Sequence, residues 1–469
     1  MQQPHSSRRK FFGQLLGGAA AGTLLPAGAA AAATPTGMVR EPAREIPLRD
    51  AADVIVCGGG PAGTAAAITA SRLGARTRLF EVHGCLGGVW TAGLLTWIFD
   101  FNKPGFTREL VAELDKRDAR RHQHASQFVY EPEAMKLLLE ELCAKAGVKV
   151  QLFTSAVAAQ RAGRQLTAVI TESKSGREAW PAPVFIDATG DGDLGAHAGC
   201  GWDTGRPGEG VPQPLTMNAV AVVRDAHALA EYISFFRDVQ RHIPAVEAFK
   251  RELQRAGIET SYGHPTLFHI RDNLVLVMIN HEYGVKATDA AALSAATVRA
   301  RAEISRVVAA LRQLGGPWAG MQVVASAEQI GIREGRRLHG RYTVTRDDLL
   351  AGARHADAVT RPTFGVDIHA LTPEGNKQET ISHGGFKMKP YDIPLRALLA
   401  KDVDGLLMAG RCISGDFIAH ASYRVTGDAV ALGEAAGAVA ALAVQNQKPP
   451  HEIAWADAAL ALEKLRARL

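Results

Sequence analysis

Asp53-Val-Ile-Val-Cys-Gly-Gly-Gly-Pro-Ala-Gly63 is the stretch that decides the fold. Its apolar first half has the length of a strand, and Gly58, Gly60 and Gly63 follow in GxGxxG spacing. A helix rich in small residues follows to about Leu73. The first glycine permits a tight turn, the second lets backbone amides approach a pyrophosphate, and the third lets helix pack on strand. The helix N-terminus supplies partial positive charge, so this stretch predicts a dinucleotide-binding βαβ unit.

The residues after this helix support the same interpretation. Residues 76–80 read as a second strand, and Glu81 follows where its carboxylate can accept both hydroxyls of an adenosine ribose. An acid at this position favours an unphosphorylated ribose, and therefore FAD or NAD rather than NADP. A purely structural glycine turn is the alternative, which the flanking strands and the acid disfavour.

A second glycine-rich turn distinguishes between these two dinucleotides. It contains Gly87, Gly88 and Gly93 and begins directly after Glu81, where a nicotinamide domain usually proceeds into another crossover. Flavoproteins often place a second loop along FAD at this point. Much later, residues 185–193 read as a strand that ends in an Ala-Thr-Gly turn.

The C-terminal part supplies a further strand and glycine turn. Residues 403–411 form this segment, and a smooth Ala/Gly helix runs from Val425 to about Gln445. The N-terminus of that helix is placed to face the pyrimidine edge of a flavin, where its dipole would stabilise the reduced anion.

Together these segments resemble a bacterial FAD-dependent oxidoreductase family, often labelled xanthan-lyase-like, that has a glutathione-reductase-type FAD fold. The similarity extends to residues 330–337 and 393–396. It is clearest over residues 53–93, 131–200 and 325–437. The resemblance implies an α/β fold, with a discontinuous Rossmann-like FAD-binding domain and an inserted α+β substrate domain. The family is functionally heterogeneous, so it implies no particular substrate.

The late motif departs from that of the better-understood flavoprotein disulfide reductases. Their motif ends in Ala-x-Gly-Asp, whereas Arg411 follows Ala409-Gly410 here and Asp416 lies five residues later. Either residue could contact the ribityl chain. The complete set expected to bind FAD is Gly58, Gly60, Pro61, Ala62, Gly63, Glu81, Val82, Gly87, Gly88, Gly93, Val157, Ala188, Gly190, Gly410, Arg411, Val425 and Thr426.

The N-terminus predicts export. Ser7-Arg8-Arg9-Lys10-Phe11-Phe12 resembles the twin-arginine motif, and a weakly apolar segment and small residues near Ala33 follow it. We expect a periplasmic or secreted protein without a membrane span after cleavage. The expected organisation is a signal peptide at 1–33, the FAD-binding domain at 50–200 and 346–447, the substrate domain at 201–345, and a C-terminal tail or helix at 448–469.

Composition excludes several classes of protein. The 469 residues are 47% hydrophobic and 22% charged, which disfavours a disordered chain or a multi-span membrane protein. The formal charge is +5, and residues 1–33 carry three basic residues and no acid, so the remainder has 50 basic and 48 acidic residues, or +2. This charge gives no reason to expect nucleic acid as a partner.

The five cysteines are odd in number, widely spaced and without a CxxC pair. They argue against a disulfide scaffold, a zinc site or a thioredoxin-type reductase, and we expect isolated, mostly buried thiols and no metal. A covalent link to FAD through His83, Cys85 or Cys412 stays open as an alternative.

Candidate catalytic residues precede the last helix. His420, Tyr423 and Arg424 form a dense polar cluster, with His420 as the first candidate base and a structural histidine as the alternative. His383, in a Ser-His-Gly-Gly loop, is the second candidate. Three arginines beside Glu334 could bind a carboxylate or phosphate, or form an ion-paired domain junction: Arg333, Arg336 and Arg337.

The sequence therefore predicts an exported FAD-dependent dehydrogenase or oxidase that oxidises a small organic substrate by hydride transfer to flavin N5. The expected electron acceptor is a quinone, a cytochrome or oxygen, because the periplasm offers no nicotinamide pool. Two alternatives stay open: a flavin-dependent lyase or isomerase acting on a carbohydrate or glycoside, and a non-catalytic flavin electron carrier.

Overall fold

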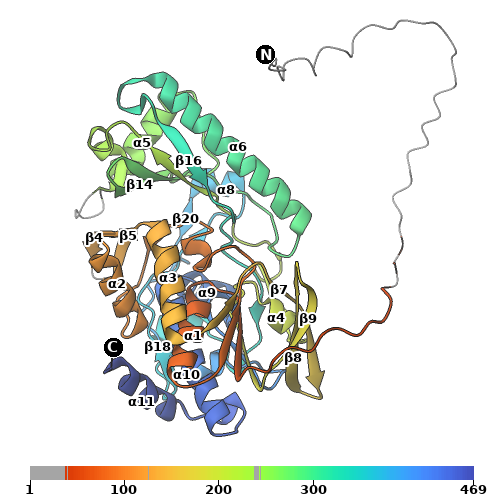
Figure 1. Ribbon diagram of the computed structural model, residues 1–469. Helices are drawn as coiled ribbons and strands as arrows, with labels where there is room; N and C mark the ends of the chain where they lie inside the picture. Colours follow the sequence, from red (N-terminus) through yellow and green to blue (C-terminus); the bar gives the residue numbers. More distant parts are fainter. Residues whose placement is uncertain are drawn as a thin grey trace, which may run out of the picture. The chain divides into compact units, whose positions relative to one another are not determined.

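The computed structural model describes residues 37, 39, 41–124, 126–236, 242 and 244–468 (Figure 1). The predicted export signal lies outside these residues. The chain divides into a short unit that ends at Glu45 and a unit formed by Ile46–Leu469, which contains all the helices and strands described below.

A five-stranded parallel sheet organises the second unit. Its order is β22-β10-β1-β2-β6, and β1 is buried along its whole length, which explains its unbroken apolar sequence. β10 and β22 are neighbours although more than 200 residues separate them, so the sheet is assembled from distant segments. The predicted α/β, Rossmann-like fold class is confirmed. The strands are β1 (Val54–Cys57), β2 (Thr77–Phe80), β6 (Lys149–Gln151), β10 (Val184–Asp187) and β22 (Leu406–Met408).

Two helices of small residues pack closely beside this sheet. α1 (Pro61–Arg72) follows β1, and α10 (Thr426–Gln445) lies against it. A Cβ at Gly433 or Gly437 would come within 2.1 Å and 2.3 Å of backbone oxygens of α1, so only glycine permits this approach. By length and composition α10 could span a membrane, but 89% of its apolar window is buried inside the protein, as in a core helix.

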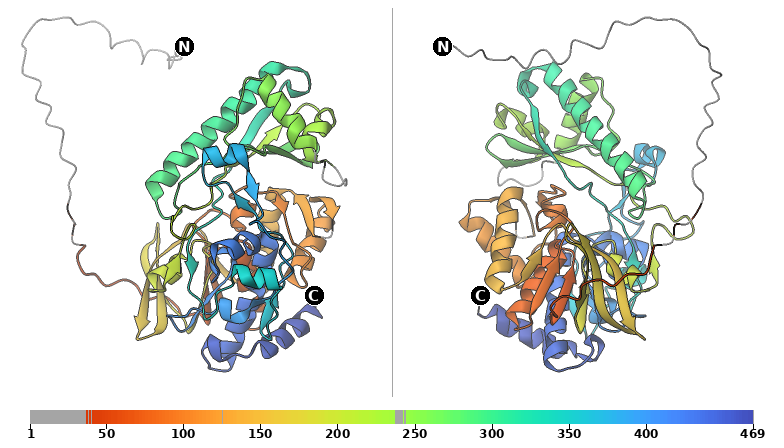
Figure 2. Two further views of the ribbon diagram at one scale, coloured as in Figure 1. Left: turned by 180° about the vertical axis from the view of Figure 1, so that it is seen from behind. Right: turned by 45° about the vertical axis from the view of Figure 1, so that its right-hand side comes forward.

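A second sheet lies in the chain between β10 and β22. Its order is β13-β14-β15-β12-β16, with antiparallel pairs except for β13 and β14. The long helix α6 (Ala290–Leu314) packs its apolar face into the core of this sheet, and Figure 2 shows it running along the sheet. This core spans residues 215–330 and also takes in Trp97, whose ring stacks on Phe235. From Leu338 the chain packs again into the other core, which surrounds the parallel sheet.

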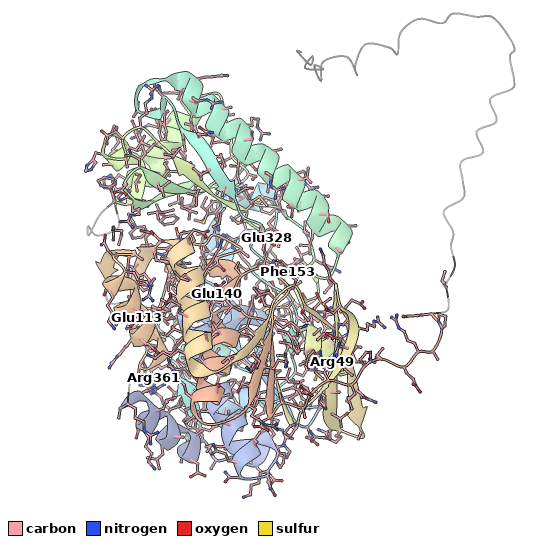
Figure 3. All side chains as sticks on the ribbon, in the orientation of Figure 1. Arg49, Glu113, Glu140, Phe153, Glu328 and Arg361 are labelled. Carbon is pink, nitrogen blue, oxygen red and sulfur yellow. The ribbon has the colours of Figure 1, made fainter. Side chains whose placement is uncertain are left out.

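Smaller sheets complete the second unit. β7, β8 and β9 form a three-stranded antiparallel sheet. Arg49, labelled in Figure 3, pairs with Glu178 of β9 across 2.5 Å. The remaining strands are β3 (Trp97–Ile98), β4 (Arg120–His124), β5 (Gln127–Tyr130), β7 (Ser155–Ala162), β8 (Gln165–Ser173), β9 (Gly176–Pro181), β11 (Trp202–Asp203), β12 (Asn218–Val222), β13 (Ile233–Phe235), β14 (Thr266–Arg271), β15 (Leu274–Met278), β16 (Gln322–Ser326), β17 (Arg337–Leu338), β18 (Ala358–Thr360), β19 (Ile368–His369), β20 (Ile381–Ser382) and β21 (Ile393–Pro394).

The other helices connect and cover these sheets. α9 ends directly before α10, at the edge of the site described next. Their bounds are α2 (Phe106–Lys116), α3 (Pro132–Ala146), α4 (Asp193–His197), α5 (Pro244–Arg255), α7 (Arg346–Ala351), α8 (Pro373–Gln378), α9 (Phe417–Tyr423) and α11 (Trp455–Arg466).

Candidate active site

A cavity of about 1540 Å³ runs from the carboxyl ends of β1 and β10 to the second sheet. This exceeds the roughly 300–1,000 Å³ of a typical small-molecule pocket, which leaves room for a dinucleotide and a further molecule. One wall, which we call the turn wall, consists of glycine turns and the N-termini of α1 and α10. The opposite wall, the side-chain wall, consists of side chains from the second sheet and from the segment between residues 331 and 383.

The turn between β1 and α1 is shaped by its glycines. Gly58 has φ +99°, and a Cβ there would lie 2.3 Å from the carbonyl oxygen of Ala188, which directly follows the neighbouring strand β10. A Cβ at Gly63 would lie 1.7 Å from the oxygen of Gly58, so the helix can approach the turn only with glycine. A Cβ at Gly60 would meet nothing within 4 Å. Gly60 lines the cavity, so this empty space is where a ligand can touch the backbone.

Glu81 stands at the end of β2 with its carboxylate held by the backbone. Oε2 accepts a hydrogen bond from the Gly59 amide at 2.5 Å, and Oε1 accepts one from the His83 amide at 2.9 Å. The side chain is buried and lines the cavity. Because each carboxylate oxygen has a second lone pair, the fixed carboxylate can also accept the two hydroxyls of a ribose.

The late glycine turn places Arg411 on the cavity. Its guanidinium pairs with Asp191, beside Gly190 in the turn after β10. Asp416 lies elsewhere, because its carboxylate caps α9 through the Ala419 amide at 2.7 Å and is not among the cavity residues. Of the two candidates for the ribityl chain, only Arg411 is therefore in position.

The N-terminus of α10 also opens onto the cavity. Val425, Thr426 and Ala429 line it, and the N-cap residue Val425 has no side chain that accepts a hydrogen bond from the first turn of the helix. The free amides and the helix dipole therefore direct partial positive charge toward the cavity.

Most residues expected to bind FAD or act in catalysis line this one cavity. They are Gly58, Gly60, Pro61, Ala62, Glu81, Val82, Gly88, Gly93, Ala188, Gly190, His383, Gly410, Arg411, Arg424, Val425 and Thr426. Five others do not line it: Gly63, Gly87, Val157, His420 and Tyr423.

Local geometry explains two of these exceptions. Val157 lies where the pairing of β7 with β8 shifts register, between Ala156 and Ala158, and the cavity is lined by Ala156 instead. Gly87 has φ +105° and shapes the turn before Gly88, and its Cβ would come within 2.7 Å of Thr91.

His420 and Tyr423 are on the inner face of α9. Both are fully buried, and the Tyr423 hydroxyl donates to the Ile413 carbonyl at 3.1 Å. Burial, together with the nearby Arg337 and Arg424, holds the pKa of His420 well below its usual range. The structure thus places the first candidate base inside the protein as a neutral histidine that a substrate in the cavity does not reach.

His383 is differently placed. It lines the cavity, and its Nδ1 lies 2.8 Å from the Val366 carbonyl oxygen. A carbonyl only accepts hydrogen bonds, so Nδ1 carries the proton of the neutral ring and Nε2 keeps its lone pair. His383 is therefore the predicted histidine that can take a proton from a molecule in the cavity.

Arg424 belongs to a group that the sequence did not reveal in full. Its Nη2 donates to the Asp367 backbone oxygen at 2.8 Å and to Oδ2 at 2.9 Å, and the same Oδ2 lies 3.2 Å from Nε2 of His369. Burial would raise the pKa of Asp367, but His369, Arg424 and Arg333 together hold it below its usual range. Burial and Arg333 lower the pKa of His369 to about 4, so this ring is neutral near pH 7.

The three arginines of the 333–337 segment have different environments. Arg337 forms a buried pair with Glu334, and Arg336 pairs with Asp193 at 2.7 Å. These two fit the predicted ion-paired junction. Arg333 instead lines the cavity and donates to uncharged oxygens.

The five cysteines are buried and unpaired, as expected. Cys85 and Cys412 do not line the cavity, whereas His83 does, beside Glu81 and 3.4 Å from Glu328. Glu328 and Phe153 are labelled in Figure 3, where the second sheet meets the part built on the parallel sheet. In the part of the chain that the structure describes, no group of His, Cys, Asp or Glu could hold a metal ion.

The turn wall fits an extended dinucleotide. It combines the empty space at Gly60, the fixed carboxylate of Glu81 and two helix N-termini directed at one cavity. The fold and site therefore define a dinucleotide-binding α/β enzyme.

The chain belongs to the FAD dependent oxidoreductase family, whose model matches residues 53–469. It is a flavoenzyme, and FAD is its cofactor. A search of curated proteins finds no significant match.

Solved structures give distant similarities. A geranylgeranyl bacteriochlorophyll reductase-like protein from Thermoplasma acidophilum is 14% identical, with 90% of this chain and 88% of that chain covered and a TM-score of 0.46. p-Nitrophenol 4-monooxygenase from Pseudomonas putida DLL-E4 is 10% identical, with 86% and 82% covered and a TM-score of 0.45. At this level of similarity they carry no argument about the reaction.

Proposed function

We propose that this enzyme is an exported FAD-dependent dehydrogenase or oxidase that oxidises a small organic substrate. The observation that supports this most directly is that the turn wall and titratable side chains line one and the same cavity. When bound, FAD supplies a two-electron acceptor for the substrate. The side chains of the opposite wall bind the substrate and remove its proton.

His383 is the base in this proposal. Its Nδ1 contact with the Val366 carbonyl fixes the ring and directs the basic lone pair to Nε2. Arg424, which directly precedes the N-cap residue of α10, is held beside the cavity by its ion pair with Asp367 and orients its donors there. A quinone, a cytochrome or oxygen would then take the electrons.

The test is an anaerobic screen of the mature holoenzyme against small organic molecules. We expect bleaching of the flavin absorbance by a subset of them and only slow reduction by NADH or NADPH. Rapid reduction by either nicotinamide would contradict the proposal and favour a monooxygenase. Product formed under argon without any acceptor, and without net reduction of the flavin, would favour the lyase or isomerase alternative.

Export is tested separately. The proposal rests on Ser7 to Phe12 and the following weakly apolar segment. We expect the full chain to be found in the periplasm with its first ~33 residues removed, and a double Arg8→Lys and Arg9→Lys variant to stay in the cytoplasm as a folded, FAD-loaded precursor. Periplasmic accumulation of that variant would contradict the twin-arginine route.

A further inference from the structure

Arg333 has free hydrogen-bond donors on the side-chain wall. Its Nη1 donates to the Pro214 carbonyl at 2.8 Å and to the Thr216 hydroxyl at 2.7 Å. Among the described residues, Nε and Nη2 have no hydrogen-bond partner, and neither atom is sealed off from the cavity that Arg333 lines. Two donors of the planar guanidinium are therefore held in place and available to a ligand.

Arg333 has no carboxylate in direct contact among the described residues, and Asp367, which acts on its charge from farther away, is paired with Arg424. Within the described ranges, no acidic oxygen lies within 4 Å of it, and the adjacent Glu334 is turned toward Arg337. Burial and the nearby Arg424 lower the pKa of Arg333 only to about 10, so the guanidinium is charged near pH 7. Enclosing a charge without a carboxylate in contact is costly, and an anion bound in the cavity would lower that cost.

The charged groups around Arg333, counted together with it, have a net charge of one positive unit. Arg424 is already paired with Asp367 at 2.9 Å. Burial lowers the pKa of His369 to about 4 and that of His281 well below its usual range, so both rings are uncharged near pH 7. One surplus charge matches a monoanion better than a phosphate dianion, and the guanidinium fork matches the two oxygens of a carboxylate.

We infer that the substrate of this enzyme carries a carboxylate, which Arg333 binds through Nε and Nη2. This inference rests on the proposed function, because it names the substrate class of the same site. Arg333 then anchors one end of the substrate while His383 approaches another part of it from the same cavity.

The experiment measures ligand binding to the oxidised holoenzyme, without turnover. Benzoate and acetate are titrated against their uncharged amides, benzamide and acetamide, and inorganic phosphate is titrated in parallel, with the perturbation of the flavin spectrum as the readout. We expect the wild type to bind benzoate more tightly than benzamide. In Arg333→Met, we expect benzoate binding to weaken by about 10- to 100-fold and benzamide binding to stay unchanged.

Two further variants complete the design. Arg301→Met removes an exposed arginine of α6 that lies outside the cavity, and we expect it to bind benzoate as the wild type does. Arg333→Lys keeps the positive charge but lacks the planar pair of N–H donors of the guanidinium. It tests the inference if Arg333→Met does not fold. We expect it to bind benzoate more weakly than the wild type.

Several results would overturn the inference. They are equal binding of benzoate and benzamide by the wild type, tighter binding of phosphate than of benzoate, and unchanged benzoate binding by Arg333→Met or Arg333→Lys. A shift of the flavin midpoint potential in Arg333→Met without a change in benzoate binding would assign the guanidinium to the flavin instead. If benzoate binds through Arg333 but no carboxylic acid reduces the flavin, the result would contradict the proposed oxidation. It would still support an anion-binding site at Arg333.

Discussion

The turn wall and the side-chain wall face the same cavity but are built differently. The turn wall presents backbone, held by glycines such as Gly58 and by the fixed carboxylate of Glu81. The side-chain wall presents Arg333, His383 and the Asp367 group, which come from separate short segments. The shape of the turn wall therefore depends on the backbone conformations that its residues allow. The binding properties of the side-chain wall depend on the charges and tautomers of its side chains.

This difference separates the two tasks of the enzyme. Backbone amides and helix N-termini bind phosphates of any dinucleotide with this shape, so the turn wall fixes the cofactor. In the proposed function, the side chains of the other wall select the substrate and move its proton. Substitutions in the two walls should therefore produce different kinds of failure.

The largest effect is expected at Gly58. In Gly58→Ala the new methyl would lie 2.3 Å from the Ala188 oxygen at φ +99°, and backbone strain alone costs about 1–3 kcal/mol. We expect loss of bound FAD and a lower free energy of unfolding of the apoprotein, measured by the flavin-to-protein ratio and by urea denaturation.

Gly60→Ala is the matched control for this substitution. Its methyl meets nothing within 4 Å and needs no unusual backbone conformation, so the apoprotein should be as stable as the wild type. FAD binding should still weaken, by about 1–3 kcal/mol, because the methyl fills the space where the ligand approaches. Equal apoprotein stability for both variants would mean that Gly58 only binds the ligand.

The next effect concerns proton transfer. We expect His383→Asn to lower kcat by about 100- to 10,000-fold and to keep its FAD, because general base catalysis contributes that much. His420→Asn should instead lower Tm, with kcat of the FAD-loaded enzyme nearly unchanged, because His420 is fully buried away from the cavity. The opposite pattern would restore His420 as the base. The measurements are turnover with the identified substrate and thermal unfolding.

A smaller effect is expected at Glu81. Glu81→Gln replaces one carboxylate oxygen by an NH2 group, which then faces an amide donor of Gly59 or His83. The carboxylate also loses one oxygen that can accept a hydrogen bond from a ribose hydroxyl. Loss of such a hydrogen bond to a charged group should weaken FAD binding by about 1.5–3 kcal/mol, measured by titrating the apoprotein with FAD. Glu178→Gln, a matched change at a buried glutamate of β9, should leave FAD binding as it is.

The turn wall could be predicted from the sequence because its signals are local. The spacing of Gly58, Gly60 and Gly63, and an acid at the end of the next strand, report the chemistry of a single βαβ unit. The prediction at Val157 missed the cavity because a register shift in β7 cannot be read from alternation of residue types.

The side-chain wall was predicted only in part because its signals are not local. His420 and Arg424 are four residues apart, yet one is inside the core and the other lines the cavity. Asp367 and His369 carry no motif, and their role arises from contact with Arg424, more than 50 residues away. Arg333 could not be separated from Arg336 and Arg337 until their carboxylate partners were located.

The smallest effect concerns pH. His369 has an ordinary pKa of 6.5, which burial and Arg333 lower to about 4 in the folded protein, whereas the Asp367 carboxylate 3.2 Å from Nε2 opposes the shift. Below pH 6.5 the unfolded chain therefore takes up a proton at this ring that the folded chain does not. The contribution of neutral His369 to stability is complete above pH 6.5 and is lost as the pH falls toward 4.

We expect the free energy of unfolding to fall less steeply between pH 6.5 and 4 in His369→Gln than in the wild type, since Gln can still donate to Asp367. Urea denaturation of the FAD-loaded protein at several pH values measures this slope, with the same substitution at the exposed His197 as the control. A steeper slope in His369→Gln would mean that the folded protein holds His369 protonated. The side-chain wall would then carry a second surplus charge, and a dianion rather than a carboxylate would be its matching ligand.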